Sequence, residues 1–130
     1  MEENVRGRIV VVDDDSDLLR LMLFLLRSKG FEVLGFSTGQ EAKAYLEKEE
    51  NLQNCSLLIL DRLLPDMDGL DILKEMKKTF SKLCPVIILS VLSSDQDILS
   101  GLTGGAVDYI SKPFNLEIFS EKVKKLLLTQ

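Results

Sequence analysis

The sequence predicts an α/β domain built on a parallel β-sheet with helices on both faces. Short apolar runs alternate with longer amphipathic ones along the chain. The runs at residues 9–12 and 57–60 are apolar throughout, which is typical of strands buried on both faces. A carboxylate follows each of these two runs directly. In an open α/β sheet, the carboxyl ends of the strands are where ligands bind.

Length and composition favour one domain. We expect the 130 residues to form a single domain over residues 1–130, with its core at about 7–128. A hydrophobic content of 45% and a charged content of 28% argue against disorder, and the net charge of −5 argues against direct nucleic-acid binding. The absence of histidine excludes a Ser-His-Asp triad and most zinc sites. Cys55 and Cys84 belong to no CxxC motif and are expected to be small buried apolar side chains.

The chain carries no sign of a membrane or export segment. Residues 1–8 lack the apolar stretch of a signal peptide, and no segment approaches eighteen uninterrupted apolar residues. We therefore expect a cytoplasmic protein that does not enter a membrane.

Strands are predicted where short apolar runs are bounded by glycine, proline or acidic residues. Pro85 is compatible with this assignment because proline is tolerated as the first residue of a strand. The predicted strands cover residues 8–12, 31–36, 56–60, 85–90 and 107–111.

Helices are predicted where apolar residues recur at helical spacing. Asp15 or Ser16 is expected to cap the first helix, Gly30 to end it, and Asn115 to cap the last. The turn residues Asp68 and Gly69 precede the third helix. The predicted helices cover residues 16–29, 38–50, 70–80, 95–103 and 116–128.

Strands that alternate with helices imply a parallel, doubly wound sheet with right-handed crossovers. For five strands we expect the flavodoxin-like (βα)5 fold with strand order 2-1-3-4-5, which places strands 1 and 3 side by side. Asp13, Asp14 and Asp61 then converge at one edge. The other aspartates near this edge are expected to be helix caps and turn formers: Asp15, Asp17, Asp66 and Asp68.

Converging carboxylates need a cation or a proton. Two of them about 4 Å apart repel by about 4 kcal/mol at an effective dielectric constant of roughly 20. An all-oxygen site of this kind suits Mg²⁺, which in turn favours a phosphoryl ligand. Ser90 and Lys112 end the fourth and fifth predicted strands. A hydroxyl and an ammonium beside a carboxylate are what an acyl phosphate on that carboxylate requires.

Four motifs in order carry a resemblance to a known family: VVDDD, ILDRLLPDMDG, PVIILS and GGAVDYISKPF. From about residue 7 to its end, the chain resembles the response-regulator receiver domain of two-component signalling, of the chemotaxis-receiver type. The resemblance implies a phosphorylation-dependent switch rather than an enzyme. It assigns Asp61 as the acceptor of a phosphoryl group from a phosphohistidine, and Asp13, Asp14, Asp61 and the backbone carbonyl of Leu63 as Mg²⁺ ligands.

The resemblance also assigns the switch residues. Ser90 corresponds to the hydroxyl that moves onto the phosphoryl group, and Tyr109 to the aromatic that turns inward with it. Lys112 corresponds to the lysine that contacts the phosphate, and its peptide bond to Pro113 is expected to be cis.

The implied partners are proteins. The resemblance implies a sensor histidine kinase or phosphotransfer protein as donor, and a downstream output domain or protein as receiver of the signal. The output face comprises residues 95–103, 107–111 and 116–128. On the last predicted helix, Ile118 and Leu128 lie partly outside the apolar stripe that faces the core. This position fits either a contact with a second copy or an output partner, or ordinary exposed apolar residues.

Four positions depart from the usual pattern. Val91 stands where the family generally has alanine or glycine, so it could narrow access to Asp61. Leu63 and Leu92 occupy positions that often carry polar residues, so we expect slow loss of the phosphoryl group. Arg62 is expected to point away from the site, toward solvent or a partner.

Three alternative functions stay open. A phosphatase of the haloacid-dehalogenase type would need an acid/base aspartate two residues after the acceptor, where this chain has Leu63. A flavodoxin-like FMN binder would need a phosphate loop rich in Ser, Thr or Gly after the first strand, where three aspartates stand instead. The third is a receiver that has lost phosphorylation and acts only as an interaction module, which Val91 keeps open.

Overall fold

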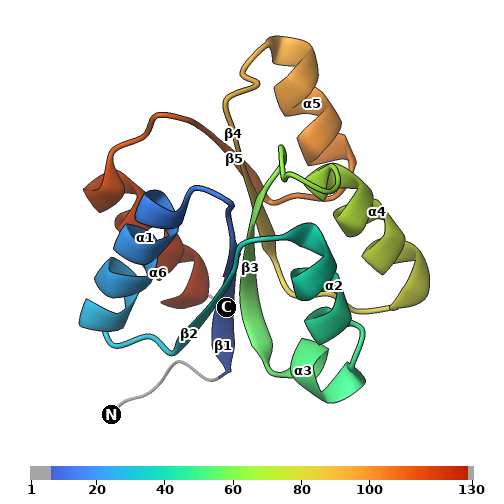
Figure 1. Ribbon diagram of the computed structural model, residues 1–130, viewed down its shortest axis with the longest axis horizontal. Coiled ribbons are helices and arrows are strands. Elements are labelled where there is room, and N and C mark those ends of the chain that lie inside the picture. The colour runs from blue at the N-terminus through green and yellow to red at the C-terminus, as the bar shows by residue number, and fades with distance from the viewer. Residues whose placement is uncertain (1–6, 129–130) are drawn as a thin grey trace.

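Five parallel strands form one sheet in the order β2-β1-β3-β4-β5 within the described part of the chain (Figure 1). The computed structural model describes residues 7–128, so most of the N-terminal stretch predicted to lack a signal peptide lies outside the described residues. The order confirms the predicted 2-1-3-4-5 topology. The strands are β1 (Arg8–Val12), β2 (Val33–Phe36), β3 (Cys55–Asp61), β4 (Val86–Ser90) and β5 (Asp108–Ser111).

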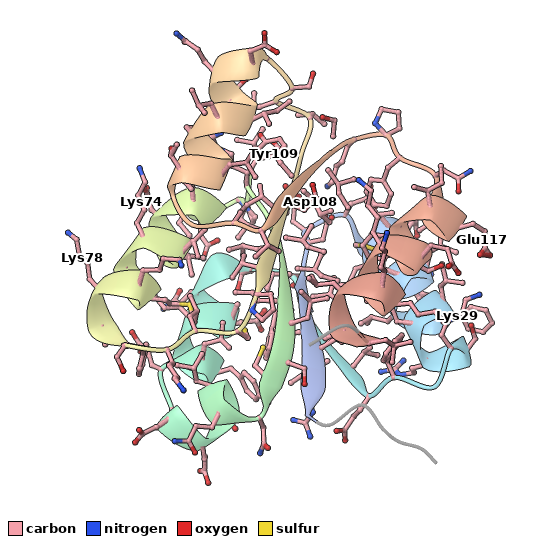
Figure 2. The ribbon with its side chains drawn as sticks, turned by 180° about the vertical axis from the view of Figure 1, so that it is seen from behind. Lys29, Lys74, Lys78, Asp108, Tyr109 and Glu117 are labelled. Atoms are coloured by element: carbon pink, nitrogen blue, oxygen red, sulfur yellow. The ribbon has the colours of Figure 1, made fainter. Side chains whose placement is uncertain are left out.

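Helices cover both faces of the sheet, as predicted. On one face lie α1 (Ser16–Ser28) and α6 (Leu116–Leu128), and on the other lie α2 (Gly39–Leu46), α3 (Glu49–Gln53), α4 (Gly69–Thr79) and α5 (Asp95–Thr103) (Figure 1). At the rim of the first face, Lys29 and Glu117 form an ion pair at 3.7 Å between α1 and α6 (Figure 2). None of the described helices is both long and apolar enough to cross a membrane.

The two faces explain why the central strands are apolar without alternation. Ile9 and Val11 of β1 belong to the buried cluster beneath α1 and α6. Val10 and Val12 belong to the cluster beneath α2 to α5. Successive side chains of a strand point to opposite faces, so a strand covered on both sides must be apolar at every position.

The predicted helix over 38–50 is wrong, because the chain forms two helices, α2 and α3, in this region. Leu46 and Leu52 are buried in the same cluster. In one continuous helix, residues six positions apart would point about 120° apart around the axis. Lys48 is extended, with φ −80° and ψ 121°, and this break lets both leucines face the sheet. The other boundaries differ from the predicted ones by at most two residues.

Aspartates cap three helices. The Asp15 carboxylate accepts a hydrogen bond from Leu18 N at 3.1 Å, and Asp68 accepts one from Leu70 N at 2.8 Å. Asp66 accepts from Gly39 N at 2.9 Å and from Gln40 N at 2.8 Å, so it caps α2 from the loop after β3. The predicted structural role of these three residues is confirmed. Of the two residues predicted to cap α1, Asp15 is the cap and Ser16 is the first residue of the helix.

We expect Asp66→Asn to lower the melting temperature by a few degrees at neutral pH, because a neutral amide replaces a carboxylate that accepts two backbone hydrogen bonds. These hydrogen bonds hold the pKa of Asp66 below its usual value. The carboxylate therefore stabilises the fold above the unfolded pKa, and this contribution is lost as the pH falls through the lower folded pKa. Thermal unfolding followed by circular dichroism should show the difference between the two proteins vanishing in acid.

Asp17→Asn is the matched control, since Asp17 lies exposed in the first turn of α1. It should change the melting temperature little at any pH. Equal losses from the two substitutions would contradict the capping role of Asp66.

Candidate functional site

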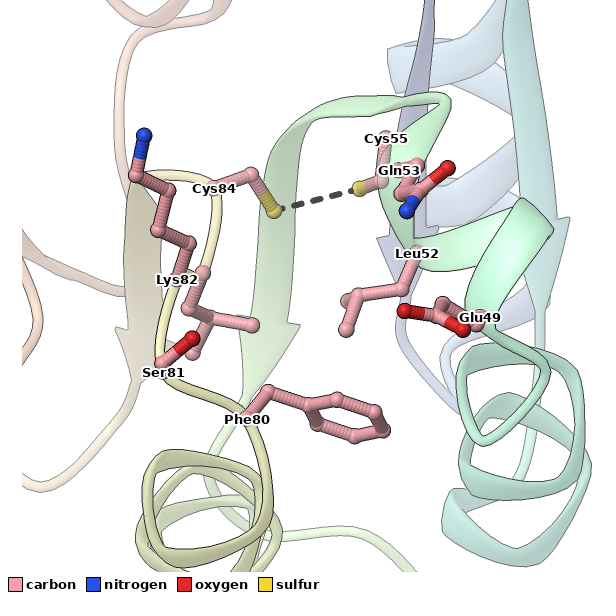
Figure 3. Close-up of a pocket in the computed structure, with 9 residues that line it drawn as sticks. Glu49, Leu52, Gln53, Cys55, Phe80, Ser81, Lys82 and Cys84 are labelled. Carbon is pink, nitrogen blue, oxygen red and sulfur yellow. Dashed lines mark hydrogen bonds between the residues drawn. The ribbon is translucent and has the colours of Figure 1, made fainter.

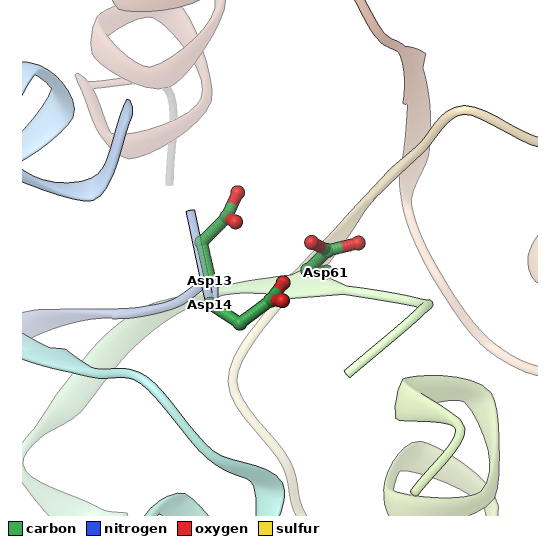
Figure 4. A group of neighbouring side chains, drawn as sticks. All are labelled: Asp13, Asp14 and Asp61. Atoms are coloured by element: carbon green, nitrogen blue, oxygen red, sulfur yellow. The ribbon is translucent and has the colours of Figure 1, made fainter. Parts of the chain in front are cut away.

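Three carboxylates meet where β1 and β3 end. Asp13 and Asp14 follow β1, Asp61 ends β3, and these two strands pair in parallel up to Val12 and Leu60. One oxygen atom from each carboxylate lies within 4.8 Å of the others (Figure 4). The predicted convergence of these three residues is confirmed.

The three carboxylates differ in their surroundings. Asp13 is fully buried and Asp61 is 3% exposed, whereas Asp14 is exposed. Backbone amides orient the buried pair: Asp15 N donates to Asp13 Oδ1 at 2.9 Å, and Leu63 N donates to Asp61 Oδ1 at 3.1 Å. The exposed Asp14 is therefore the carboxylate that meets solvent first.

Lys112 joins the two buried carboxylates. Its Nζ lies 2.9 Å from Asp13 Oδ2 and 2.9 Å from Asp61 Oδ2. Burial lowers the pKa of Lys112, but the two carboxylates raise it by more, so the side chain stays an ammonium. Burial raises the pKa of Asp61 to about 6; the Asp13 charge acts in the same direction and Lys112 opposes it.

The site has more negative charge than Lys112 can balance. Among the described residues, buried Asp13 Oδ2 accepts no well-directed hydrogen bond, although the Lys112 ammonium lies 2.9 Å away. Three carboxylates beside one ammonium, with no nitrogen or sulfur ligand among them, form a donor set that fits a hard divalent cation.

Ser90 and Tyr109 both hold Leu92. Ser90 ends β4, is fully buried, and accepts a hydrogen bond from Leu92 N at 3.0 Å through Oγ. Tyr109 of β5 is 8% exposed and donates through its hydroxyl to the Leu92 carbonyl at 2.7 Å. The tyrosine ring lies under α5 (Figure 2), against Gly101, where a Cβ atom would collide with it. The backbone of Leu92 is therefore bonded both to the last residue of β4 and to the tyrosine of β5.

The expectation that Arg62 points toward solvent or a partner is wrong. Its side chain is 13% exposed, and Nη1 donates to the Asp97 carbonyl and to Ser100 Oγ of α5, each at 3.2 Å. Nε lies 3.6 Å from Asp68 Oδ1, at the start of α4. Alternation along the strand explains the direction, because Arg62 follows Asp61 and shares the face of Leu60, which α4 and α5 cover.

The mouth of the site is apolar at two of the positions singled out in the sequence. Leu63 is 45% exposed and Val91 is 60% exposed. Val91 lines a surface depression together with Lys112 and Pro113. The peptide bond between Lys112 and Pro113 is cis, as predicted.

Gly69 is a residue of the site that sequence reasoning treated only as a turn former. A Cβ atom at Gly69 would collide with the backbone carbonyl oxygen of Asp61. Gly69 N donates to the Arg62 carbonyl at 2.7 Å. The absence of a side chain at the first residue of α4 therefore lets this helix begin directly against the strand that carries Asp61.

Comparison with known proteins places this chain in a family. The model of the response regulator receiver domain matches residues 9–124. The regulatory protein VanRc of Enterococcus gallinarum is 42% identical over 108 residues, covering 83% of this chain and 44% of that protein. The transcriptional regulatory protein CpxR of Klebsiella pneumoniae is 38% identical over 121 residues, covering 93% of this chain and 49% of that protein.

The chain thus spans about half the length of these curated relatives. Among solved structures, a CheY-like response regulator receiver domain protein of Methanospirillum hungatei aligns with a TM-score of 0.83 at 31% identity, covering 95% of each chain. The family match extends over most of the sequence, and the sheet has the strand order 2-1-3-4-5 that was predicted from the sequence. The chain therefore belongs to the family of response regulator receiver domains of two-component signalling.

Proposed function

We propose that Asp61 accepts a phosphoryl group from a phosphohistidine of a sensor kinase or phosphotransfer protein. The observation that carries the proposal is the buried Asp61 carboxylate, held between Lys112 and two further carboxylates. A carboxylate oxygen of Asp61 attacks the phosphorus, the bond from phosphorus to the imidazole nitrogen breaks, and its electron pair stays on the imidazole. The product is an acyl phosphate on Asp61.

In this proposal Asp13, Asp14, Asp61 and the backbone carbonyl of Leu63 would hold Mg²⁺, which supplies positive charge to the phosphoryl oxygens. The lack of a well-directed hydrogen bond to Asp13 Oδ2 and the excess negative charge support this assignment. Lys112, already 2.9 Å from Asp61 Oδ2, pairs with a phosphoryl oxygen and needs little movement to do so.

The proposed switch passes through Leu92. When the Ser90 hydroxyl turns to the phosphoryl group, it gives up its hydrogen bond from Leu92 N. Tyr109 holds the carbonyl of the same residue, so a shift of Leu92 reaches the tyrosine and α5. Arg62 forms a second link, from the residue beside the acceptor to Asp97 and Ser100 of α5.

The proposed output surface comprises α5, β5 and α6. Ile118 is 59% exposed and Leu128 is 56% exposed on α6, which fits contact with an output domain, an output protein or a second copy of the chain. VanRc and CpxR are named as regulatory proteins and are about twice as long as this chain. A phosphohistidine donor of the sensor-kinase type also fits the expected cytoplasmic location.

Incubation with acetyl phosphate and Mg²⁺ should add one phosphoryl group to the intact protein, measured by mass spectrometry. Asp61→Asn should show no adduct, because an amide is not a nucleophile of comparable strength. Chelation of the metal should slow the reaction by roughly tenfold or more, since the charge on the phosphoryl oxygens is then balanced by Lys112 alone. Asp17→Asn is the control and should react as the unchanged protein does. No adduct in the unchanged protein under any condition would leave a non-phosphorylated interaction module as the best account.

The phosphorylated protein should lose its phosphoryl group slowly, over far longer than seconds. Leu63 and Leu92 offer no polar group that could orient an attacking water. Leu63→Asn should speed the loss by roughly tenfold, whereas Leu63→Met should not, and the 45% exposure of Leu63 makes both changes tolerable for folding. Time courses of the adduct after removal of the donor measure the rate. Self-dephosphorylation of the unchanged protein within seconds would refute this expectation.

Arg62→Gln should leave acceptance of the phosphoryl group intact and loosen α5, because the guanidinium bonds to Asp97 and Ser100 disappear. A loss of about 1–2 kcal/mol in unfolding free energy is expected for hydrogen bonds of this kind. Hydrogen exchange over residues 95–103, with and without phosphorylation, is the measurement. Arg62→Lys should recover part of the protection through its single ammonium. Unchanged exchange in Arg62→Gln would show that Arg62 does not restrain α5.

A further inference from the structure

The two cysteines lie against each other at the amino edge of the sheet, opposite to the edge that carries the carboxylates. Cys55 is the first residue of β3, and Cys84 lies in the segment between α4 and β4. Both are free thiols, and Cys84 Sγ donates a hydrogen bond to Cys55 Sγ at 3.3 Å (Figure 3). The expectation of small buried side chains is confirmed for Cys55, but Cys84 is only half-buried.

A register shift brings the two thiols together. β1 pairs Arg8 with Cys55 but Ile9 with Leu57, so one extra residue of β3 lies between these pairs. Without the shift, side chains would alternate regularly along β3, and Cys55 would lie on the same face of the sheet as Leu57. Instead it belongs to the cluster of Leu58, against which Cys84 also packs. The bulge thus places the Cys55 side chain on the face of the sheet where Cys84 packs.

A pocket lies beside the two thiols, with Cys84 half-buried and Cys55 6% exposed. It has a volume of about 480 Å³ and is also lined by residues of α3 and of the segment after α4 (Figure 3). The hydrogen bond from Cys84 holds the pKa of the Cys55 thiol below its usual value. The same contact, together with burial, raises the pKa of Cys84. Because Cys84 Sγ is the donor in the 3.3 Å hydrogen bond, this contact stabilises the thiolate form of Cys55, while Cys84 holds the shared proton.

We propose that Cys55 and Cys84 form a redox modification site that closes into a reversible intramolecular disulfide when hydrogen peroxide reaches the pocket. The Cys55 thiolate attacks one peroxide oxygen, the O–O bond breaks, and the departing oxygen leaves as water after protonation. Cys84 then loses its proton and attacks the resulting sulfenic sulfur, the S–O bond breaks, and a second water leaves. One peroxide is reduced, and two thiols are oxidised to one disulfide.

Formation of the disulfide requires only a modest movement of the two cysteines. The sulfurs must approach from 3.3 Å to about 2.05 Å. Cys84 lies in a segment without helix or strand, so this side of the pair can move without breaking a ladder of the sheet. The disulfide would link the two ends of the segment that contains β3, with Asp61 as its last residue, and α4. Because it restricts the unfolded chain, it should raise the melting temperature by roughly 5–15 °C.

The test exposes the reduced protein to hydrogen peroxide, alkylates the remaining thiols, and measures intact mass and peptides over time. The expected product has lost two hydrogen atoms, resists alkylation at both cysteines, contains a peptide that joins residues 55 and 84, and reverts with dithiothreitol. The same reaction in denaturant should be slower by roughly tenfold or more, because the fold holds the sulfurs together.

Cys84→Ser and Cys55→Ser should both fail to give this product, and in Cys84→Ser the Cys55 thiol should take up oxygen instead. Asp61→Asn should form the disulfide as the unchanged protein does, which separates this site from the proposed phosphorylation. The proposal is overturned if the folded protein gains oxygen without the joined peptide, if only links between chains form, or if the denatured chain closes as fast.

Discussion

The repulsion among three carboxylates at the ends of β1 and β3 is the constraint around which the rest of the site is organised. Two of them are buried, and Lys112 reaches both at 2.9 Å from the end of β5. One ammonium cannot balance three carboxylates, so the edge retains a strong attraction for a cation. The raised pKa of Asp61 reports the same imbalance, since burial and Asp13 both disfavour its charge. The site is thus prepared for a partner that brings positive charge.

Hydrogen bonds connect the charged site to α5 along two routes. Leu92 is held by its amide to Ser90 and by its carbonyl to Tyr109, so a single residue connects two neighbouring strands. Arg62 extends the connection from the acceptor strand to α5. Both links run through hydrogen bonds between side chains and residues of neighbouring elements. In the proposed function, the acyl phosphate supplies the competing partner for Ser90.

Much of the fold followed from local patterns. The alternation of five apolar runs with amphipathic ones predicted the strand order. The acidic residues after β1 and β3 then predicted the meeting of Asp13, Asp14 and Asp61. Prediction failed where a side chain's role depends on a distant element. Nothing near residues 38–50 indicates that Leu46 and Leu52 must face the same sheet, and that requirement divides the helix. The direction of Arg62 was open to prediction from strand alternation, but its partners on α5 were not.

The sequence by itself determined which acidic and polar residues stand at the carboxyl ends of the strands, because hydrophobic period and strand ends are local properties that need no knowledge of distant neighbours. Only the tertiary structure decided how those residues are paired. The choice of Lys112 as the common partner of two carboxylates, the capping of α2 by Asp66 and the approach of Cys55 to Cys84 each join segments far apart in the chain. Such contacts depend on crossovers and on a register shift in β3, and a shift of one residue reverses which face a side chain occupies.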